Sequence, residues 1–177
     1  MEEPPDGATE DPRNNPNVEA MSRWEEVLAD MEATASEYRD QGWDATELHP
    51  GDVAMVLPDE QDDPGIDIIL PKDEFQALQD HGMEDGGFDT IEAFQAGSPD
   101  FVYLLLAIED TDSKHVVLTP AYYQVTEDAR GLFEHAIKQG KIDIFLRTLT
   151  GEEIVVSHKN PGLLAPPEFN PEDSTDE

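Results

Sequence analysis

The chain of 177 residues carries 42 acidic and 10 basic side chains, which gives a formal net charge of −32, and it contains no cysteine. A chain of this length fits one domain with tails. The lack of cysteine excludes disulfides, thiol nucleophiles and cysteine-ligated metals. Because the sequence has no basic stripe, we expect no direct binding to nucleic-acid phosphates.

A long helix is predicted first, because apolar residues recur with spacings of three and four over residues 21–38. Asn17 is a suitable N-cap, and a capping box of Ser22 and Glu25 inside the first turn is the alternative. Gly42 is a natural stop after the last turn. The apolar stripe favours a helix that packs on a sheet. A coiled-coil seam is the alternative, but three repeats are short for one. The stripe consists of Met21, Trp24, Leu28, Met31, Ala35 and Tyr38.

The middle of the chain predicts short extended segments separated by turns, and one short helix. Pro50 and Gly51 occupy the second and third positions of a type II turn signal. The helix begins after Pro71 and has Phe75 and Leu78 as its expected buried contacts. The segments are strands at residues 45–49, 53–57, 66–70 and 88–95, the helix at residues 71–81, and loops at residues 58–65 and 83–87.

The run FVYLLLAI at residues 101–108 is apolar on both faces, which is typical of a central strand. Residues 115–119 are its expected antiparallel neighbour. Strands at residues 142–149 and 153–157 then form a hairpin through Thr150 and Gly151.

A second good helix is predicted at residues 126–139, between the central strands and the hairpin. Thr126 is a suitable N-cap, and Gly140 is the expected residue after the last turn. Acidic residues in the first turn favour the positive end of the helix dipole. Its predicted inner face consists of Leu132, Phe133, Ala136 and Ile137.

These elements indicate an α+β protein with a single domain at residues 17–165, in which a mixed or mainly antiparallel sheet carries about three helices. The topology of the sheet stays open. The segments at residues 1–16 and 166–177 are rich in proline and acidic residues and lack apolar periodicity. We expect them to be disordered acidic tails.

The excess of acid indicates adaptation to concentrated salt. Ten of the 42 acidic residues fall in the two expected tails, so most of them belong to the domain. Self-repulsion on this scale destabilises a compact state unless it is screened, and the Debye length is only about 3 Å at 1 M salt. Monovalent cations are the expected counterions. The alternatives are an ordinary acidic cytosolic protein and an acidic mimic of nucleic acid.

The N-terminal sequence MEEPPDGATEDPRNNPN lacks the basic and apolar regions of a signal peptide. The longest apolar run is far shorter than the roughly 20 residues that span a bilayer. We therefore expect a cytoplasmic protein without membrane contact.

No recognisable arrangement for catalysis, for a cofactor or for a metal is present. The five histidines are far apart in the sequence, and no pair has HExxH spacing. The acidic residues at 59–63 resemble the start of a calcium loop, but proline replaces the required glycine and no glutamate follows at the twelfth position. A similar start at Asp110 and Asp112 fails at Lys114.

If a ligand site exists, strand ends and the loops that follow them are favoured places. On that basis the weak candidates are His115 and His158, joined by Arg147 and by the tyrosines. The aromatic residues are candidates for lining a pocket, although a core in which most of them are packed and the tyrosine hydroxyls reach the surface is the favoured interpretation. The candidate ligand-site residues are His115, His158, Arg147, Tyr122 and Tyr123, and the wider aromatic set adds Trp24, Trp43, Phe101 and Tyr103.

Two segments resemble an uncharacterised protein family of halophilic archaea. They are YRDQGWDATELHPGDVAMVLP at residues 38–58 and GKIDIFLRTLTGEEIVVSHKNPGLLAP at residues 140–166. The resemblance implies a cytoplasmic protein of a high-salt cell. It carries no activity and no catalytic residues that could be assigned to this chain.

Three functional hypotheses follow. The first is a non-enzymatic interaction or regulatory module, with another protein as its partner, because no catalytic arrangement is recognisable and acidic tails suit interaction arms. The second is a small hydrolase or transferase with a dispersed active site. The third is the acidic nucleic-acid mimic. The oligomeric state stays open.

Overall fold

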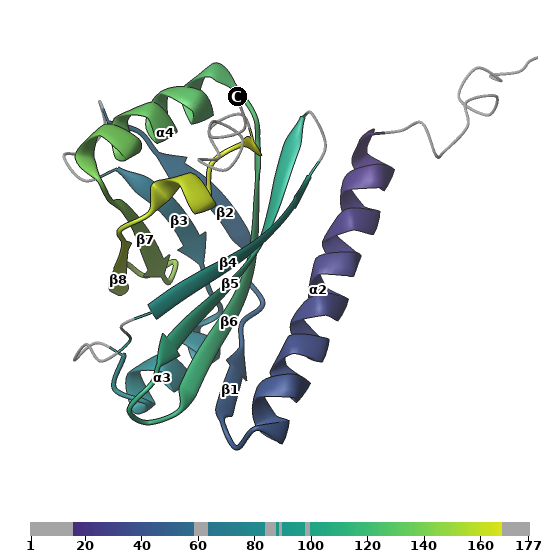
Figure 1. Cartoon of the computed structure of the whole chain (residues 1–177), viewed down its shortest axis with the longest axis vertical. Coiled ribbons are helices and arrows are strands. Elements are labelled where there is room, and N and C mark those ends of the chain that lie inside the picture. The colour runs from purple at the N-terminus through teal and green to yellow at the C-terminus, as the bar shows by residue number, and fades with distance from the viewer. Residues whose placement is uncertain (1–15, 59–63, 84–87, 89, 98–99, 168–177) are drawn as a thin grey trace, which may run out of the picture.

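The computed structural model describes residues 16–58, 64–83, 88, 90–97 and 100–167. Two four-stranded sheets and one long helix form three layers (Figure 1). The helix, α2 (Pro16–Asp40), lies along one face of the first sheet, and the second sheet lies on the other face. The first sheet has the order β1-β6-β5-β4 and consists of β1 (Asp44–Glu47), β4 (Thr90–Gly97), β5 (Phe101–Asp110) and β6 (His115–Gln124).

The second sheet has the order β2-β3-β7-β8. Each sheet contains one parallel pair, β1 with β6 in the first and β3 with β7 in the second, and its other pairs are antiparallel. The strands of the second sheet are β2 (Asp52–Val56), β3 (Gly65–Ile69), β7 (Ile142–Arg147) and β8 (Glu153–His158).

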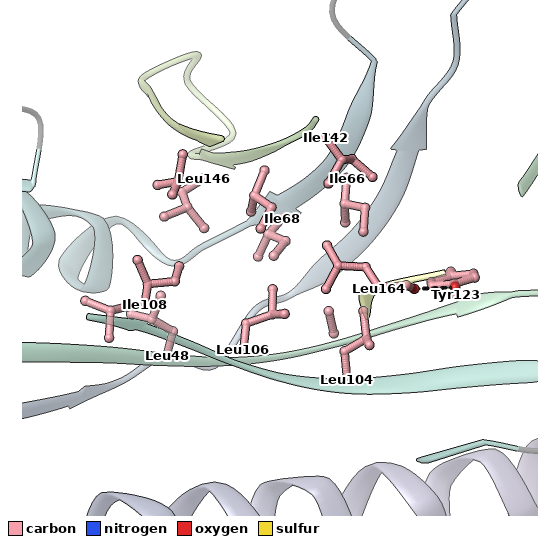
Figure 2. Close-up of a cluster of buried hydrophobic side chains, with 14 of the residues drawn as sticks. Leu48, Ile66, Ile68, Leu104, Leu106, Ile108, Tyr123, Ile142, Leu146 and Leu164 are labelled. Atoms are coloured by element: carbon pink, nitrogen blue, oxygen red, sulfur yellow. Dashed lines mark hydrogen bonds between the residues drawn. The ribbon is translucent and has the colours of Figure 1, made fainter. Parts of the chain in front are cut away.

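The main core lies between the two sheets, where aliphatic side chains from both inner faces meet (Figure 2). Ile66 and Ile68 of β3 project toward Leu104 and Leu106 of β5, and all four are fully buried. Alternate residues of one strand point to one face, so a strand such as β5 supplies this core with every second side chain. Its other side chains supply a second core beneath α2.

The second core is the interface between α2 and the first sheet. Val27, Met31 and Ala35 of α2 are buried against Leu105 and Val116, among others. The predicted apolar stripe is therefore confirmed for the part whose side chains the structure describes, and Val27 belongs to it as well. The partner of the stripe is a sheet, which is the packing that the sequence favours over a coiled coil.

Two shorter helices close the ends of the sheet pair: α3 (Lys72–Asp80), and α4 (Glu127–Gln139) with the 3-10 helix η3 (Pro161–Leu163). Phe75 and Leu78 are buried in α3, as predicted. On α4 the prediction is wrong at one position, since Ile137 is 41% exposed and Ala129 is buried in its place. Ala129 lies about two turns nearer the N-terminus than Ile137, on the face that contacts the core.

The α+β class and the single domain with three α-helices are confirmed for the described residues. The strands divide between two sheets, and the chain crosses from the first to the second between β1 and β2. Most of the two expected tails lies outside the described residues.

One strand is longer than its sequence predicts. β6 continues beyond the predicted residues 115–119 and through Pro120, although proline cannot donate a hydrogen bond within a sheet. The amide of Leu48 donates to the carbonyl of Leu118 at 2.9 Å, so residue 118 and, two positions later, residue 120 face the edge along which β1 runs. The register of β1 ends at Leu118. Pro120 therefore occupies an edge position that no strand partner needs.

Candidate functional site

An aromatic cluster lies where α2 passes over the far end of β6. Tyr103 and Tyr122 are directly opposite each other in the β5–β6 register, so both point toward α2. Their rings are stacked, with centroids 6.0 Å apart and planes 20° apart. Trp24 of α2 approaches Tyr122 edge-on at 5.3 Å. Phe101 completes the cluster, 6.1 Å from Tyr103 and 6.5 Å from Tyr122.

Beside this cluster is a cavity of about 260 Å³, hereafter the aromatic cavity. Its lining comes from three parts of the fold: Trp24 and Glu25 of α2, Tyr103 and Tyr122 of the first sheet, and residues 50–53 of the connection into β2. The volume lies just below the roughly 300–1,000 Å³ of typical small-molecule sites. A small molecule or a single side chain is therefore the size of ligand that fits.

A neighbouring cavity of about 460 Å³ shares Val53 and Tyr122 with the first. It lies between β2 and the end of β6, and it reaches the N-terminus of α4 at Thr126. The Thr126 hydroxyl accepts a hydrogen bond from the amide of Ala129 at 3.1 Å, so this helix end is already capped. The two cavities thus lie side by side, with Val53 and Tyr122 in the lining of both.

The aromatic cavity exists because β1 leaves the first sheet early. After Leu48 the chain turns away from β6 and crosses to the second sheet, where the amide of Gly51 donates to the carbonyl of Ile69 at 2.8 Å. This bond fixes the connection against β3. The last residues of β6 have no strand on this side, and the crossing segment and α2 leave a hollow over Tyr122.

The charges at the aromatic cavity are all negative. Glu25 and Asp52 line it, and both are exposed to solvent. None of the residues that line it is basic. Aromatic faces also carry a negative electrostatic potential. Rings and carboxylates together make an environment that favours a positive charge.

His115 begins β6 at its opposite end and is only 5% exposed. Its Nε2 lies 2.8 Å from the hydroxyl of Thr46, and its ring packs 4.0 Å from that of His81 and 5.5 Å from that of Phe88, between centroids. Burial, with a further contribution from His81, lowers the pKa of His115 despite Asp44 and Asp110. His115 is therefore a packed core histidine with a polar partner.

His158 and Arg147 lie at opposite ends of the β7–β8 hairpin, since His158 pairs with Ile142 and Arg147 pairs with Glu153. Burial lowers the pKa of His158. The Nε of Arg147 lies 2.7 Å from Oδ1 of Asp67 on β3, and its guanidinium also pairs with Glu153 at 3.1 Å. Burial raises the pKa of Asp67, although Arg147 acts in the opposite direction.

Tyr123 points away from Tyr122, into the core between the sheets. Its hydroxyl donates to the carbonyl of Leu164 at 2.6 Å, which ties the C-terminal segment to β6 (Figure 2). Burial raises the pKa of this phenol far above its ordinary value. The side chain also borders the neighbouring cavity.

The five sequence-derived candidates are thus not brought together in one place. His115 and Tyr122 are seven residues apart on one strand, which corresponds to about 23 Å. Of the five candidates, only Tyr122 borders the aromatic cavity, and none of the described cavities is lined by His115, His158 or Arg147.

Sequence reasoning missed the contribution of residues 50–53, and it did not place Glu25 in a ligand site. Trp24 and Tyr103 belong to the wider aromatic set. Their meeting with Tyr122 depends on strand register and on the path of α2, for which the sequence carries no local signal.

Among the described residues, no group of three or more His, Asp or Glu side chains could hold a metal ion. The calcium-like pattern at residues 59–63 lies outside them. At Asp110 the carboxylate instead accepts hydrogen bonds from the amides of Asp112 and Ser113, at 3.1 and 3.3 Å, and so holds the β5–β6 turn.

None of the helices in the described ranges is both long and apolar enough to cross a membrane. A family model described as a family of unknown function, DUF7529, matches residues 10–166. No curated protein and no solved structure matches the chain. The family match covers most of the 177 residues, and this chain belongs to the DUF7529 family of unknown function.

Proposed function

We propose that this protein is a non-enzymatic binding module that works in concentrated salt and takes a small ligand, or a single side chain of a partner, into its aromatic cavity. One observation carries the proposal: three aromatic side chains from α2 and the first sheet line a cavity of about 260 Å³ that is open beside Glu25 and Asp52. Mostly apolar pockets with a few polar groups are the usual form of a binding site.

The aromatic lining supports a binding role because side chains of this kind usually fill a core. Tyr122 is 40% exposed, although it has three aromatic neighbours. Large aromatic residues that remain partly exposed in a hollow are typical of binding surfaces, where they become buried when a ligand arrives.

Binding is favoured over catalysis because the only acidic or basic side chains that line this cavity are the solvent-exposed carboxylates Glu25 and Asp52 and the phenols of Tyr103 and Tyr122, with no histidine among them. A general acid or base must lie within hydrogen-bond reach of the reacting atoms. His115 is about 23 Å from Tyr122 along β6, and Arg147 is held by Asp67 and Glu153. The distribution of acid over the domain supports a high-salt setting, in which counterions screen the charge of −32.

The proposal is tested with three probes of similar shape and different charge: tetramethylammonium, tert-butanol and pivalate. Saturation-transfer NMR in molar potassium chloride measures the binding of each to the wild-type protein. We expect saturable binding of at least one probe, and its loss in Tyr122→Ala. Because Tyr122 is already partly exposed, its truncation leaves the fold intact, which circular dichroism checks.

Phe94→Ala is the matched control, because Phe94 is a 50% exposed aromatic residue of β4 that does not line the aromatic cavity. This variant is expected to bind the probes as the wild type does. If none of the three probes binds, or if Tyr122→Ala binds them unchanged, the proposed function is wrong.

A further inference from the structure

We infer that the aromatic cavity recognises an alkylated ammonium group, such as the trimethylammonium head of a small cation or of a methylated lysine. The inference rests on the proposed function and specifies its ligand. It follows from two features that meet at the same place: aromatic faces grouped around a hollow, and carboxylates at its opening.

The rings supply the first part of the recognition. Trp24, Tyr103 and Tyr122 come from different elements and meet at different angles, 64° between Trp24 and Tyr122 and 20° between the two tyrosines. Their faces are therefore not all parallel, as they would be in a simple stack. An ammonium group over such faces is attracted by the ring quadrupoles, and tryptophan and tyrosine are the strongest partners for this contact.

The carboxylates supply the second part. Glu25 follows Trp24 directly on α2, and Asp52 begins β2, so negative charge stands on two sides of the aromatic cavity. No lysine, arginine or histidine lines it to compete for these carboxylates. An alkylated ammonium offers both a positive charge and apolar methyl groups, and so it suits both parts of the lining.

Other occupants fit less well. An anion would enter a cavity without a single basic lining residue, on a chain with a net charge of −32. A second copy of the chain has 42 acidic and only 10 basic side chains, so it offers few positive groups to Glu25 and Asp52. A neutral apolar group would contact the rings but would gain nothing from Glu25 or Asp52.

The high-salt setting also selects this class of ligand. At about 1 M salt, exposed charges beyond roughly 3 Å barely sense one another, so surface attraction alone does not hold a cation. A hydrated potassium ion gains little from aromatic faces. Burial of methyl groups against rings is not screened by salt, so an alkylated ammonium can still bind when a bare cation cannot.

The test compares choline with its neutral carbon analogue 3,3-dimethylbutan-1-ol, which has the same shape without the charge. Titration calorimetry of the full chain in molar potassium chloride gives the two dissociation constants. We expect choline to bind about tenfold more tightly, as a partly desolvated cation–π contact implies. Tyr122→Phe keeps the ring and should bind as wild type, and Tyr122→Ala should lose choline.

Two further variants distinguish the contribution of the carboxylates from that of the aromatic rings. Glu25→Gln and Asp52→Asn change exposed side chains, so both should fold normally and should bind choline several-fold more weakly, while their affinity for the neutral analogue stays constant. Phe94→Ala again serves as the control for removal of an exposed aromatic ring.

The outcomes distinguish this inference from the proposed function. If the neutral analogue binds as tightly as choline and Tyr122→Ala abolishes both, the aromatic cavity is a binding site, but the inferred ligand class is wrong. If neither choline nor its neutral analogue nor any of the three earlier probes binds, both the proposed function and the inferred ligand class are wrong.

The source of the ammonium group is found by repeating the titration with a peptide that contains one trimethyllysine, against the same peptide with unmodified lysine. Tighter binding of the methylated peptide than of choline assigns the ligand to a modified protein. Tighter binding of choline assigns it to a free small cation. Equal binding of the methylated and unmodified peptides, with choline no tighter than its neutral analogue, contradicts the inference.

Discussion

Gly65 shows how closely two strands of the second sheet approach each other. It begins β3 and is paired with Asp143 of the parallel strand β7. A Cβ atom at this position would lie 1.9 Å from the carbonyl oxygen of Asp143 and 3.1 Å from Cε2 of Phe145. Both distances are shorter than van der Waals contact allows, and the nearer atom belongs to a backbone that is held in the sheet. No side chain fits here without a shift of β7.

We therefore predict that Gly65→Ala lowers the free energy of unfolding by about 3 kcal/mol, the upper part of the range for overpacked sites. Chemical denaturation in molar potassium chloride measures it. Gly131→Ala is the matched control, because its Cβ would meet nothing within 4 Å. Gly131 is exposed on helix α4, so Gly131→Ala should raise the free energy of unfolding by about 0.5–1 kcal/mol. Equal midpoints for Gly65→Ala and wild type would contradict the close contact of β3 with β7.

His115 and His158 make the stability depend on pH. Burial lowers the pKa of both histidines in the folded protein, and His81 adds to the effect at His115. Unfolded histidine titrates near pH 6.5, so below that value the unfolded state binds more protons than the folded state. The contribution of these two histidines to the free energy of unfolding should be fully present above about pH 6.5. It should be lost as the pH drops from there toward their pKa values in the folded protein.

We predict a lower free energy of unfolding at about pH 5.5 than at about pH 7.5, by at most about 1.4 kcal/mol per pH unit for each histidine. Denaturation at both values in molar potassium chloride measures the difference. The double variant His115→Gln, His158→Gln should show a smaller difference than the wild type, whatever its absolute stability. An unchanged difference would assign the pH dependence to other groups.

At the scale of the elements, α4 shows how local signals define a helix. Thr126 has extended backbone angles, and its hydroxyl accepts from the amide of Ala129 at 3.1 Å. Gly140 ends the helix in the left-handed conformation, with φ of 80°. Both roles are visible in the sequence because each depends on one residue type at one position.

We predict that Thr126→Ala lowers the free energy of unfolding by about 1 kcal/mol, the usual cost of losing an N-cap. Thr126→Ser retains a hydroxyl at the same place and should cost much less. Thermal and chemical denaturation of both variants measure the contribution of the cap. Both variants lack the methyl group of Thr126, and only the alanine variant also lacks the hydroxyl. A loss of equal size in the two variants would assign the effect to packing of the threonine methyl group.

The contrast between α4 and the aromatic cavity explains what could be predicted from the sequence. Helix ends, strand alternation and the turn at Gly151, with φ of 99°, depend on neighbours in the chain. The aromatic cavity depends on the register that places Tyr103 opposite Tyr122, and on the point where β1 leaves β6. Both are non-local, and a shift of the register by one residue would turn Tyr122 to the other face.

At the scale of the whole molecule, the division of the strands into two sheets follows from burial. β5 is apolar on both faces, because one face packs on the second sheet and the other on α2. β8 instead alternates between buried and exposed residues, since its outer face meets solvent. The sequence predicts a buried central strand from the run FVYLLLAI, but it does not say whether a helix or a second sheet covers each face.

The excess of negative charge is also a property of the whole molecule. The chain carries 42 carboxylates against 10 basic side chains, and the domain holds most of them. Ten basic side chains cannot pair with 42 carboxylates, and pairs such as Arg39 with Glu47 are partly exposed, where each contributes roughly 0–1 kcal/mol. Paired cations therefore do not offset the repulsion, and we expect screening by concentrated counterions to do so.

We predict that dialysis from molar potassium chloride into dilute buffer lowers the melting temperature by more than several degrees, since each kcal/mol lost shifts it by about 2–4 °C in a chain of this size. Circular dichroism against temperature at a series of salt concentrations measures the shift. The variant Glu26→Gln, Glu32→Gln removes two exposed charges from α2 and should reduce the salt dependence, because the remaining carboxylates repel one another less. A melting temperature that stays constant down to dilute buffer would mean that the fold tolerates its charge unscreened, and the high-salt setting would then lose its physical basis.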